Sequence, residues 1–316
     1  MNILKIAFRN LNRQKRRSML LVIAIVFAFL IVTLIDGLSA GARKSLEDQI
    51  AKAIGGHVYV AGAEKAADKT EEDKANEYLP PESIALVNKI IKEEKIDALY
   101  TTVRIQRYGT LIFAGKQLTT QIAGCKFDEE DALRNSFAFK EGGWENVKIE
   151  NALFIPQKTA EALNVALNDI ILYETTTLHG QATVAEFQIA GIYQDQSQFD
   201  QMQFYANFDY LNKTAELPAG YATQMGVFLK DENQQDAVAS IFENRLAEHG
   251  PVTSRALAAQ FNPTSPGQEL LRQLNDGKWD GTKYAVMTFY DFAPQMVTLS
   301  QTIQWISLGV LLVLLL

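Results

Sequence analysis

The stretch that decides the architecture of this chain is residues 15–35, KRRSMLLVIAIVFAFLIVTLI, in which three basic residues precede an apolar run. The run covers residues 19–35, and thirteen of its seventeen residues are Leu, Ile, Val or Phe. Side chains of this kind favour insertion of a helix into a bilayer by roughly 4 to 8 kcal/mol in total. We therefore predict a transmembrane helix over residues 18–36, at the short end of the length that spans a membrane.

Two other interpretations of this stretch stay open. The core helix of a soluble protein can be equally apolar, although such a helix rarely follows a basic cluster directly. A cleaved signal peptide is the second alternative, because Ala40-Gly41-Ala42 has the small residues of a cleavage site. The apolar run is, however, longer than the roughly 7–15 residues usual in signal peptides.

The charges of the chain are segregated along its length. The net charge is −7, yet the first acidic residue is Asp36, so the body beyond the apolar run is strongly acidic. Basic residues before a transmembrane helix keep the N-terminus in the cytoplasm and place the following chain outside. They also suit contact with anionic lipid, and the acidic body argues against nucleic acid as a partner. The residues that we assign to this membrane-interface and topology role are Lys5, Arg9, Arg13, Lys15, Arg16 and Arg17.

The first seventeen residues allow two structural interpretations. Leu4, Phe8 and Leu11 recur at helical spacing on one side, with basic residues on another. This pattern is typical of an amphipathic helix that lies in the membrane interface. A flank that only sets the topology would have the same composition.

Beyond the apolar run, helical periodicity continues through residues 37–54 as an expected stalk helix. Its stripe is formed by Leu38, Ala42, Leu46 and Ile50, and we assign the coupling of membrane and domain to these residues. Gly55-Gly56 ends the stalk. Residues 61–78 lack an apolar period and are expected to be a solvated, partly disordered excursion.

Residues 55–298 are expected to form an extracytoplasmic α+β domain, with strands joined in hairpins rather than in βαβ units. Strands are expected at residues 57–60, 99–106, 109–113, 117–123, 169–173, 184–193, 203–208 and 226–229. Helices are expected at residues 80–95, 155–163, 234–248 and from 289 onward, with a short helix inside 262–281.

The chain ends in an apolar segment that we interpret as the start of a second transmembrane helix, residues 299–316. Its last twelve residues would extend only about 18 Å as a helix, less than the roughly 30 Å of the hydrocarbon core. We therefore expect this helix to be incomplete and the sequence to be truncated.

Several motifs do not support an enzymatic site. Gly37-Leu-Ser-Ala-Gly41 has the spacing of a nucleophile elbow, but that motif needs a preceding strand, and here helical periodicity runs through it. The three histidines are far apart, without Cys or carboxylate at zinc-ligand spacing, and no phosphate-binding loop is present. The acidic run at residues 128–131 is interpreted as a solvated helix start rather than a cation site. The single cysteine, Cys125, is interpreted as a buried hydrophobe.

Five short segments carry a resemblance to a known family. They are residues 7–17, AFRNLNRQKRR; residues 56–60, GHVYV; residues 122–130, where a strand ends in Gly before an acidic stretch; residues 160–172, in which Asn168-Asp169 replaces the usual Gly-Asp; and residues 187–193. In their order these segments resemble the FtsX/MacB/LolE permeases of type VII ABC transporters. Residues 7–17 look like the opening of that family, and residues 56–60 are similar to the strand after the stalk in its LolE-like branch.

The resemblance implies a MacB-like periplasmic core with two β-rich subdomains, in a bacterial inner-membrane permease. It further implies a cytoplasmic ABC ATPase partner, a second permease protomer, and a lipoprotein or periplasmic adaptor. The implied function is to couple ATP hydrolysis by the partner to motion of the extracytoplasmic domain, for lipoprotein release or for peptide or drug export. The chain itself is then a non-catalytic membrane subunit without a cofactor.

A different class of protein shares this plan of helix, domain and helix. A membrane-anchored sensor or ligand-binding module would also place its domain between two membrane segments. Two more membrane helices after residue 316 in the intact gene would indicate a permease, and a kinase or signalling coiled coil would indicate a sensor.

Overall fold

The computed structural model describes residues 15–65, 76–178, 180–194 and 203–292, together with residues 294, 295, 298, 302, 303, 305, 306 and 309. The chain divides into two compact units. One comprises residues 1–47 and 293–316, and the other comprises residues 48–292. The predicted interface residues Lys5, Arg9 and Arg13 lie outside the described residues, as does most of the predicted second membrane helix.

The first unit is dominated by helix α2 (Lys15–Ile54), whose last residues belong to the second unit. Forty helical residues extend about 60 Å, roughly twice the hydrocarbon thickness of a bilayer. The side chains between Met19 and Ile35 are almost all exposed, which is not the pattern of a core helix of a soluble protein. Among the described residues, α2 is the one helix long and apolar enough to cross a membrane.

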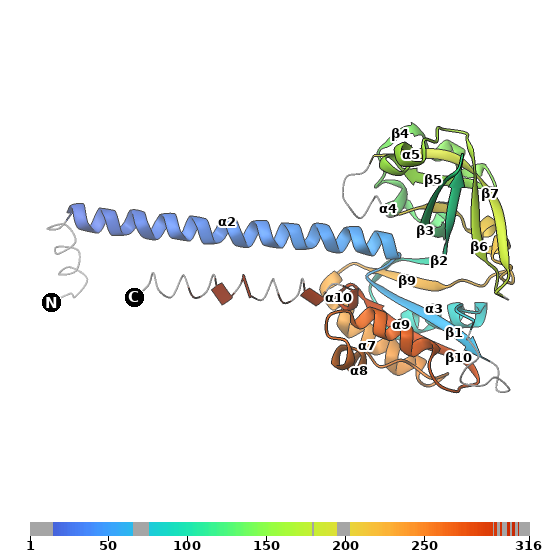
Figure 1. Cartoon of the computed structure of the whole chain (residues 1–316). Coiled ribbons are helices and arrows are strands. Elements are labelled where there is room, and N and C mark those ends of the chain that lie inside the picture. Colours follow the sequence, from blue (N-terminus) through green and yellow to red (C-terminus); the bar gives the residue numbers. More distant parts are fainter. Residues whose placement is uncertain are drawn as a thin grey trace. The chain divides into compact units, whose positions relative to one another are not determined.

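The second unit contains a four-stranded antiparallel sheet with helices on both faces (Figure 1), here called the flanked sheet. Its order is β10 (Gly281–Thr288), β1 (Val58–Lys65), β9 (Gln224–Leu229) and the first half of β2 (Ala98–Phe113). Side chains alternate between the two faces along each strand. Val58 and Val60 of β1 therefore pack with α3 (Pro81–Glu93) and α7 (Gln235–Leu246). Tyr59 and Ala61 pack on the opposite face with α8 (Arg255–Phe261) and α9 (Pro266–Asn275).

The second half of β2 enters a closed barrel of six strands. Around the barrel, β2 pairs with β3 (Lys116–Cys125), β3 with β8 (Tyr205–Asn207), and β8 with β5 (Ala152–Pro156). The ring continues through β7 (Ala182–Tyr193) and β6 (Ile170–Thr176) back to β2. Its interior holds Ile105, Leu111, Ile122, Tyr173 and Phe187. The remaining elements around the barrel are β4 (Phe139–Gly142), α4 (Asp131–Arg134), α5 (Gln157–Leu163), α6 (Phe208–Thr214) and the 3-10 turns η1 (Phe127–Glu129) and η2 (Trp144–Lys148).

Many predicted elements are confirmed in position and type. The helices expected at 80–95 and 234–248 are α3 and α7, and the short helix inside 262–281 is α9. The strands expected at 169–173 and 184–193 form the β6–β7 hairpin, and those at 117–123 and 226–229 lie in β3 and β9. Residues 37–41 lie inside α2, so they form no nucleophile elbow. Cys125 is buried, as expected.

Other predictions were wrong. Residues 61–65 are not a solvated excursion, because they complete β1, which pairs with β10 and is largely buried. The strands are not all in hairpins, since β5 runs parallel to β7 and β3 parallel to β8. Residues 99–106 and 109–113 form one strand, β2, and residues 152–156 form β5 before helix α5 begins. Helices α6 and α8 were not predicted.

The flanked sheet with its helices and the barrel are the two subdomains of the second unit, and they differ in their share of β-structure. Helices cover both faces of the flanked sheet, whereas the barrel closes on its own interior. The barrel is therefore the more strongly β-rich of the two.

Candidate functional site

The end of helix α2 lies against a group of polar side chains from two neighbouring strands of the second unit, β2 and β9. Gly55, with φ of +102°, takes the chain out of the helix and leaves the last carbonyl groups without helical partners. Arg104 Nη1 donates to the carbonyl oxygens of Lys52 at 2.7 Å and Ala53 at 2.8 Å. Gln224 Nε2 donates to Ile54 O, and Thr102 Oγ1 donates to Gly55 O. We call Thr102, Arg104 and Gln224 the helix-end socket.

The geometry of the socket follows from strand periodicity and register. Thr102 and Arg104 are two residues apart on β2, so their side chains leave the same face of the sheet. Gln224 on β9 is the direct register partner of Arg104. The next partner pair on this face brings Gly226 opposite Thr102, where a β-carbon would overlap Gly55 O. Only glycine therefore lets the end of α2 approach this closely.

Arg104 also forms a buried ion pair with Glu130. Its Nη2 lies 2.5 Å from Glu130 Oε2, and its Nε lies 3.1 Å from Oε1. The two side chains are 1% and 2% exposed, so neither charge is compensated by water. Glu130 lies between η1 and α4, shortly after barrel strand β3. The expectation that residues 128–131 are a solvated helix start is therefore wrong for Glu130.

The electrostatics of this pair keep the guanidinium charged. Burial alone would lower the pKa of Arg104, but the charge of Glu130 and the hydrogen bonds to this carboxylate raise the pKa above its ordinary value. Burial raises the pKa of the Cys125 thiol beside it, so that this thiol is neutral at pH 7. Glu130 is therefore the counter-ion of Arg104. One arginine thus joins β2, the end of α2 and the segment after β3, using four of the five N–H donors of its planar guanidinium.

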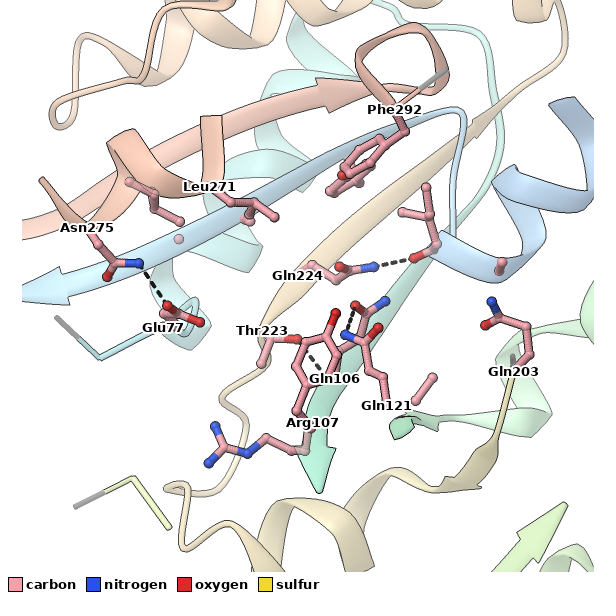
Figure 2. Close-up of a pocket in the computed structure, with 18 residues that line it drawn as sticks. Glu77, Gln106, Arg107, Gln121, Gln203, Thr223, Gln224, Leu271, Asn275 and Phe292 are labelled. Carbon is pink, nitrogen blue, oxygen red and sulfur yellow. Dashed lines mark hydrogen bonds between the residues drawn. The ribbon is translucent and has the colours of Figure 1, made fainter. Parts of the chain in front are cut away.

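A cavity of about 490 Å³ opens beside the socket, within the second unit. The last residues of α2, Ala53 and Ile54, line it together with Gln224. Figure 2 shows that its walls come from α9 and α10 (Phe289–Phe292) on one side and from β2, β3 and β9 on the other. Gln121 Nε2 donates to Gln106 Oε1 at 2.7 Å, and Asn275 Nδ2 donates to Glu77 Oε1 at 2.8 Å.

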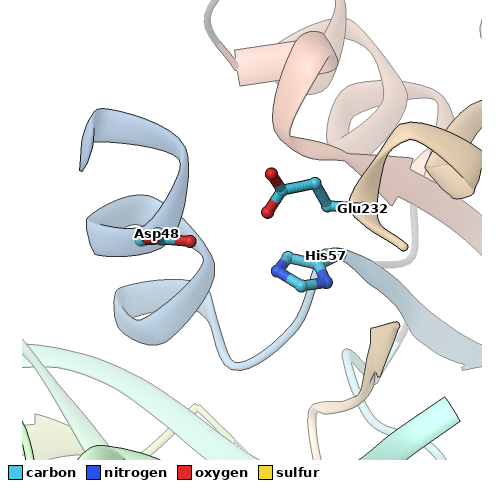
Figure 3. A group of neighbouring side chains, drawn as sticks. All are labelled: Asp48, His57 and Glu232. Carbon is cyan, nitrogen blue, oxygen red and sulfur yellow. The ribbon is translucent and has the colours of Figure 1, made fainter. Parts of the chain in front are cut away.

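A second polar cluster brings together Asp48, His57 and Glu232, shown in Figure 3. One ligand atom from each residue lies within 4.8 Å of the others, a grouping that the sequence spacing did not indicate. His57 Nδ1, however, accepts a hydrogen bond from the backbone N–H of Leu229 at 3.0 Å, which places the imidazole proton on Nε2. A neutral imidazole that bound a metal through Nε2 would carry its proton on Nδ1. That proton would then face the backbone N–H of Leu229, so that two donors would oppose each other. This hydrogen bond therefore fits a His57 side chain that donates to a carboxylate better than a His57 side chain that binds a metal ion.

The described residues among those singled out from sequence are spread along α2. Lys15, Arg16 and Arg17 are exposed at its start. In the predicted stalk stripe, Leu38 is 77% exposed and Ala42 is exposed, whereas Leu46 and Ile50 are half-buried. No residue of the socket was singled out from sequence. The available signal was a lone arginine in the apolar, β-branched segment TTVRI at residues 101–105.

The socket can hold and orient the end of a helix, because its chemistry is hydrogen bonding and charge pairing. A buried cation at a helix C-terminus also complements the negative end of the helix dipole. These contacts are suited to transmitting position rather than to bond making.

One family model matches more than half of the chain. A family model described as MacB-like periplasmic core domain matches residues 18–245. No curated protein matches the chain. Among solved structures, the periplasmic region of MacB from Actinobacillus actinomycetemcomitans is 14% identical, with a TM-score of 0.39, and the match covers 80% of this chain and 95% of that one. The extracellular domain of the noncanonic ABC-type transporter YknZ from Gram-positive bacteria is 12% identical, with a TM-score of 0.37, covering 72% and 100%.

Proposed function

This chain belongs to the family with a MacB-like periplasmic core domain and is a permease of the FtsX/MacB type, and on that premise we propose that it couples ATP hydrolysis by a cytoplasmic partner subunit to motion of its extracytoplasmic domain. The chain contributes the mechanical part and no catalytic group. Its output is lipoprotein release or the export of peptides or drugs.

The observation that carries this proposal is the capture of the last α2 carbonyls by the socket. Helix α2 is continuous from Lys15 to Ile54, so a displacement of its membrane part would arrive at Lys52 and Ala53. Arg104 holds those two carbonyls and, through Glu130, the segment after barrel strand β3. A push or a rotation of α2 would therefore reach the flanked sheet and the barrel together.

We place the protein in the bacterial inner membrane with its N-terminus in the cytoplasm, because Lys15, Arg16 and Arg17 precede the apolar run. An ABC ATPase subunit would bind on the cytoplasmic side. A second permease protomer and a lipoprotein or periplasmic adaptor would complete the assembly. Leu46 and Ile50 would transmit motion within α2.

The experiment changes the buried Arg104–Glu130 pair in the intact permease, which is expressed together with its ATPase. Arg104→Met combined with Glu130→Leu exchanges the ion pair for apolar side chains of similar volume, a change that folds often tolerate. This double variant removes the hold of Arg104 on the carbonyls of Lys52 and Ala53, and with it the link to the segment after β3, while leaving a packed core. We expect normal protein levels and normal ATPase binding, with loss of extracytoplasmic output in a complementation assay.

A matched control removes an arginine ion pair elsewhere in the domain, that of Arg245 with Glu93, by Arg245→Met. This control should keep its output, because the ion pairs of Arg245 join α7 to the end of α3 and not to α2. Full output from the double variant at normal abundance would contradict mechanical coupling through the socket.

A further inference from the structure

The chain leaves the second unit through α10, and a carboxylate within its first turn fixes where this helix begins. Asp291 Oδ2 accepts a hydrogen bond at 2.7 Å from the backbone N–H of Thr288, the residue directly before α10. A carboxylate at the third helical position that accepts from the residue before the helix is one half of a capping box. The chain beyond α10 leads to the predicted second membrane segment, residues 299–316.

Arg255, the first residue of α8, holds the same carboxylate from outside the turn. Its Nε donates to Asp291 Oδ2 at 2.9 Å, and its Nη2 lies 3.3 Å from Asp291 Oδ1, so the two groups meet side by side. The same Nη2 lies 2.7 Å from Asp236 Oδ1 on α7 and 2.9 Å from Thr288 Oγ1. The side chains of Arg255 and Asp291 are 16% and 9% exposed, so water screens their attraction weakly. We call this pair the exit clamp.

The surroundings of the exit clamp keep the arginine charged. Burial alone would lower the pKa of Arg255, but the charge of Asp291 and the hydrogen bonds to Asp236 and Asp291 raise the pKa above its ordinary value. Glu243 Oε1 on α7 accepts from the backbone N–H of Arg255 at 3.2 Å. Arg255 is therefore bound to α7 through both its backbone and its side chain.

Three other contacts place α10 on the flanked sheet and its helices. Gln235 Oε1 on α7 accepts from the backbone N–H of Phe289 at 3.3 Å. The ring of Phe292 stacks on Tyr59 of β1, with the two centroids 5.7 Å apart. A β-carbon at Gly267 of α9 would lie 2.9 Å from the Phe292 ring, so α9 also approaches closely. Compared with these three contacts, the exit clamp is the one that joins opposite charges.

The exit of the chain and the end of α2 are held on the same face of the flanked sheet. Tyr59, which stacks on Phe292, is the register partner of Gly226, the glycine that admits the end of α2. Direct partners on antiparallel strands share a face. Arg104 binds the end of α2 and Arg255 binds the start of α10, each together with a carboxylate. A body attached at one point can turn about that point, whereas two attachments fix its orientation.

We propose that Arg255 is a positioning residue that fixes the exit of the chain from the domain, as Arg104 fixes its entry. With both arginines in place, a displacement of α2 relative to the exit would turn the domain in a defined direction. Without the exit clamp, α10 would pivot on its remaining contacts, and the domain would follow α2 alone. The consequence for output rests on the proposed function, whereas the clamp itself is a property of the chain alone.

The first measurement is hydrogen exchange of the full chain in phosphatidylcholine nanodiscs. Arg255→Met with Asp291→Asn removes the ion pair but keeps a side-chain oxygen that can accept from the Thr288 N–H. We expect the amides of residues 288–292 to exchange roughly tenfold faster, as for local opening of an element that has lost a contact. The amides of β5, in the barrel, should exchange as in the unaltered chain. Arg245→Met, which removes two ion pairs of α7, is the matched control and should leave residues 288–292 unchanged.

The second measurement uses the intact permease together with its ATPase. The double variant should reach normal abundance and hydrolyse ATP at the normal rate, while output per ATP hydrolysed falls roughly fivefold or more, a modest coupling between sites. A purely structural role would lower abundance and leave this ratio unchanged. Arg255→Lys keeps the charge without the planar fork and should restore part of the output. Arg245→Met should keep the full ratio.

Two results would overturn the inference. One is exchange at residues 288–292 that is unchanged in the double variant, or faster by the same factor as in β5. The other is full output per ATP in this variant while the variant at Arg104 and Glu130 has lost its output. If both double variants keep full output, the coupling proposal is contradicted, and hydrogen exchange alone decides whether Arg255 fixes the exit. If the double variant does not accumulate, Arg255→Lys replaces it in both measurements, with smaller changes expected in the same directions.

Discussion

Arg104 and Gln224 are direct partners across the β2–β9 pair, and each donates to a carbonyl at the end of helix α2. Two neighbouring strands thus hold the helix from within the sheet rather than from a loop. Gln224 lies on a strand that is paired on both sides, with β1 and β2, and Arg104 lies on the segment of β2 that is paired with β9, so this attachment is stiffer than one formed by a flexible connection.

The buried pair should show strong non-additivity in stability. Arg104→Ala leaves the Glu130 carboxyl group in the interior without its arginine partner, and we expect a loss of about 3–5 kcal/mol. The double change Arg104→Met with Glu130→Leu leaves no buried charge and loses mainly the two carbonyl contacts, so its cost should be about 1–2 kcal/mol. Thermal or urea unfolding in detergent measures both. A double variant that is less stable than Arg104→Ala would contradict this account.

Glycine at position 226 should be irreplaceable. A β-carbon there would overlap Gly55 O and press against Thr102 Oγ1, so Gly226→Ala must move backbone. We expect a loss of about 1–3 kcal/mol or more, as for other overpacked sites. Gly37→Ala is the control, because Gly37 is helical with open space around its Cα, and alanine there should stabilise by about 0.5–1 kcal/mol. Equal stability of the two variants in urea unfolding would count against the close approach.

The decrease in the free energy of unfolding at acidic pH should depend on Glu269. Hydrogen bonds from Arg272 and Gln273 lower the pKa of this carboxyl from its ordinary 4.5 to about 2. A depressed folded-state pKa contributes stability above pH 4.5, and that stability is lost as the pH falls from 4.5 toward 2. Glu269→Gln should therefore flatten the dependence of unfolding free energy on pH in this interval and change little at lower pH. If the free energy of unfolding of the variant fell with pH as steeply as that of the unaltered chain, Glu269 would not be responsible for this pH dependence.

A proline within α2 should uncouple the domain without blocking insertion. Leu46→Pro removes a helical hydrogen bond and clashes with the preceding turn, at a cost of about 3 kcal/mol or more. Position 46 lies eleven residues after the apolar run ends at Ile35, so membrane insertion and ATPase binding should be retained while output is lost. Lys44→Ala, at an exposed helical position, should leave the output intact. Complementation with a protein-level blot distinguishes the two outcomes.

Topology is the most direct check on the whole proposal. A reporter fused at Lys95, an exposed residue after α3, should report an extracytoplasmic location, and one fused before Arg16 a cytoplasmic one. If the Lys95 fusion is active only in the cytoplasm, the domain lies on the wrong side for a permease of this type.

The sequence predicted the elements whose pattern is local. Helices α3 and α7 and the β6–β7 hairpin have periodic apolar residues and clear breakers, and all three were found. The strand at residues 152–156 was missed, because a strand buried on both faces reads as a continuous apolar run without alternation. Closure of the barrel depends on β5 and β7 pairing in parallel although they are far apart in the sequence, which local periodicity cannot reveal.

The socket could not be predicted for a related reason. Arg104 and Glu130 are separated by 26 positions, and each looks like an ordinary surface charge within its own segment. Their burial is decided by where β2 leaves the flanked sheet and by the path of the chain after β3. Residues 128–131 contain four carboxylates in sequence, and nothing local marks the third as the one that turns inward.

Strand β2 also constrains how this protein can change over evolution. Its first half pairs with β9 in the flanked sheet, and its second half pairs with β3 and β6 in the barrel. The same alternation of side chains between the two faces of the strand therefore decides which residues are buried in the sheet and in the barrel. Insertion or deletion of a single residue near Arg104 would reverse every later side chain of the strand and turn Ile105 and Leu111 out of the barrel interior. Homologous chains should therefore keep the sixteen residues of β2 without insertions or deletions, and should differ in length in the connections outside this strand.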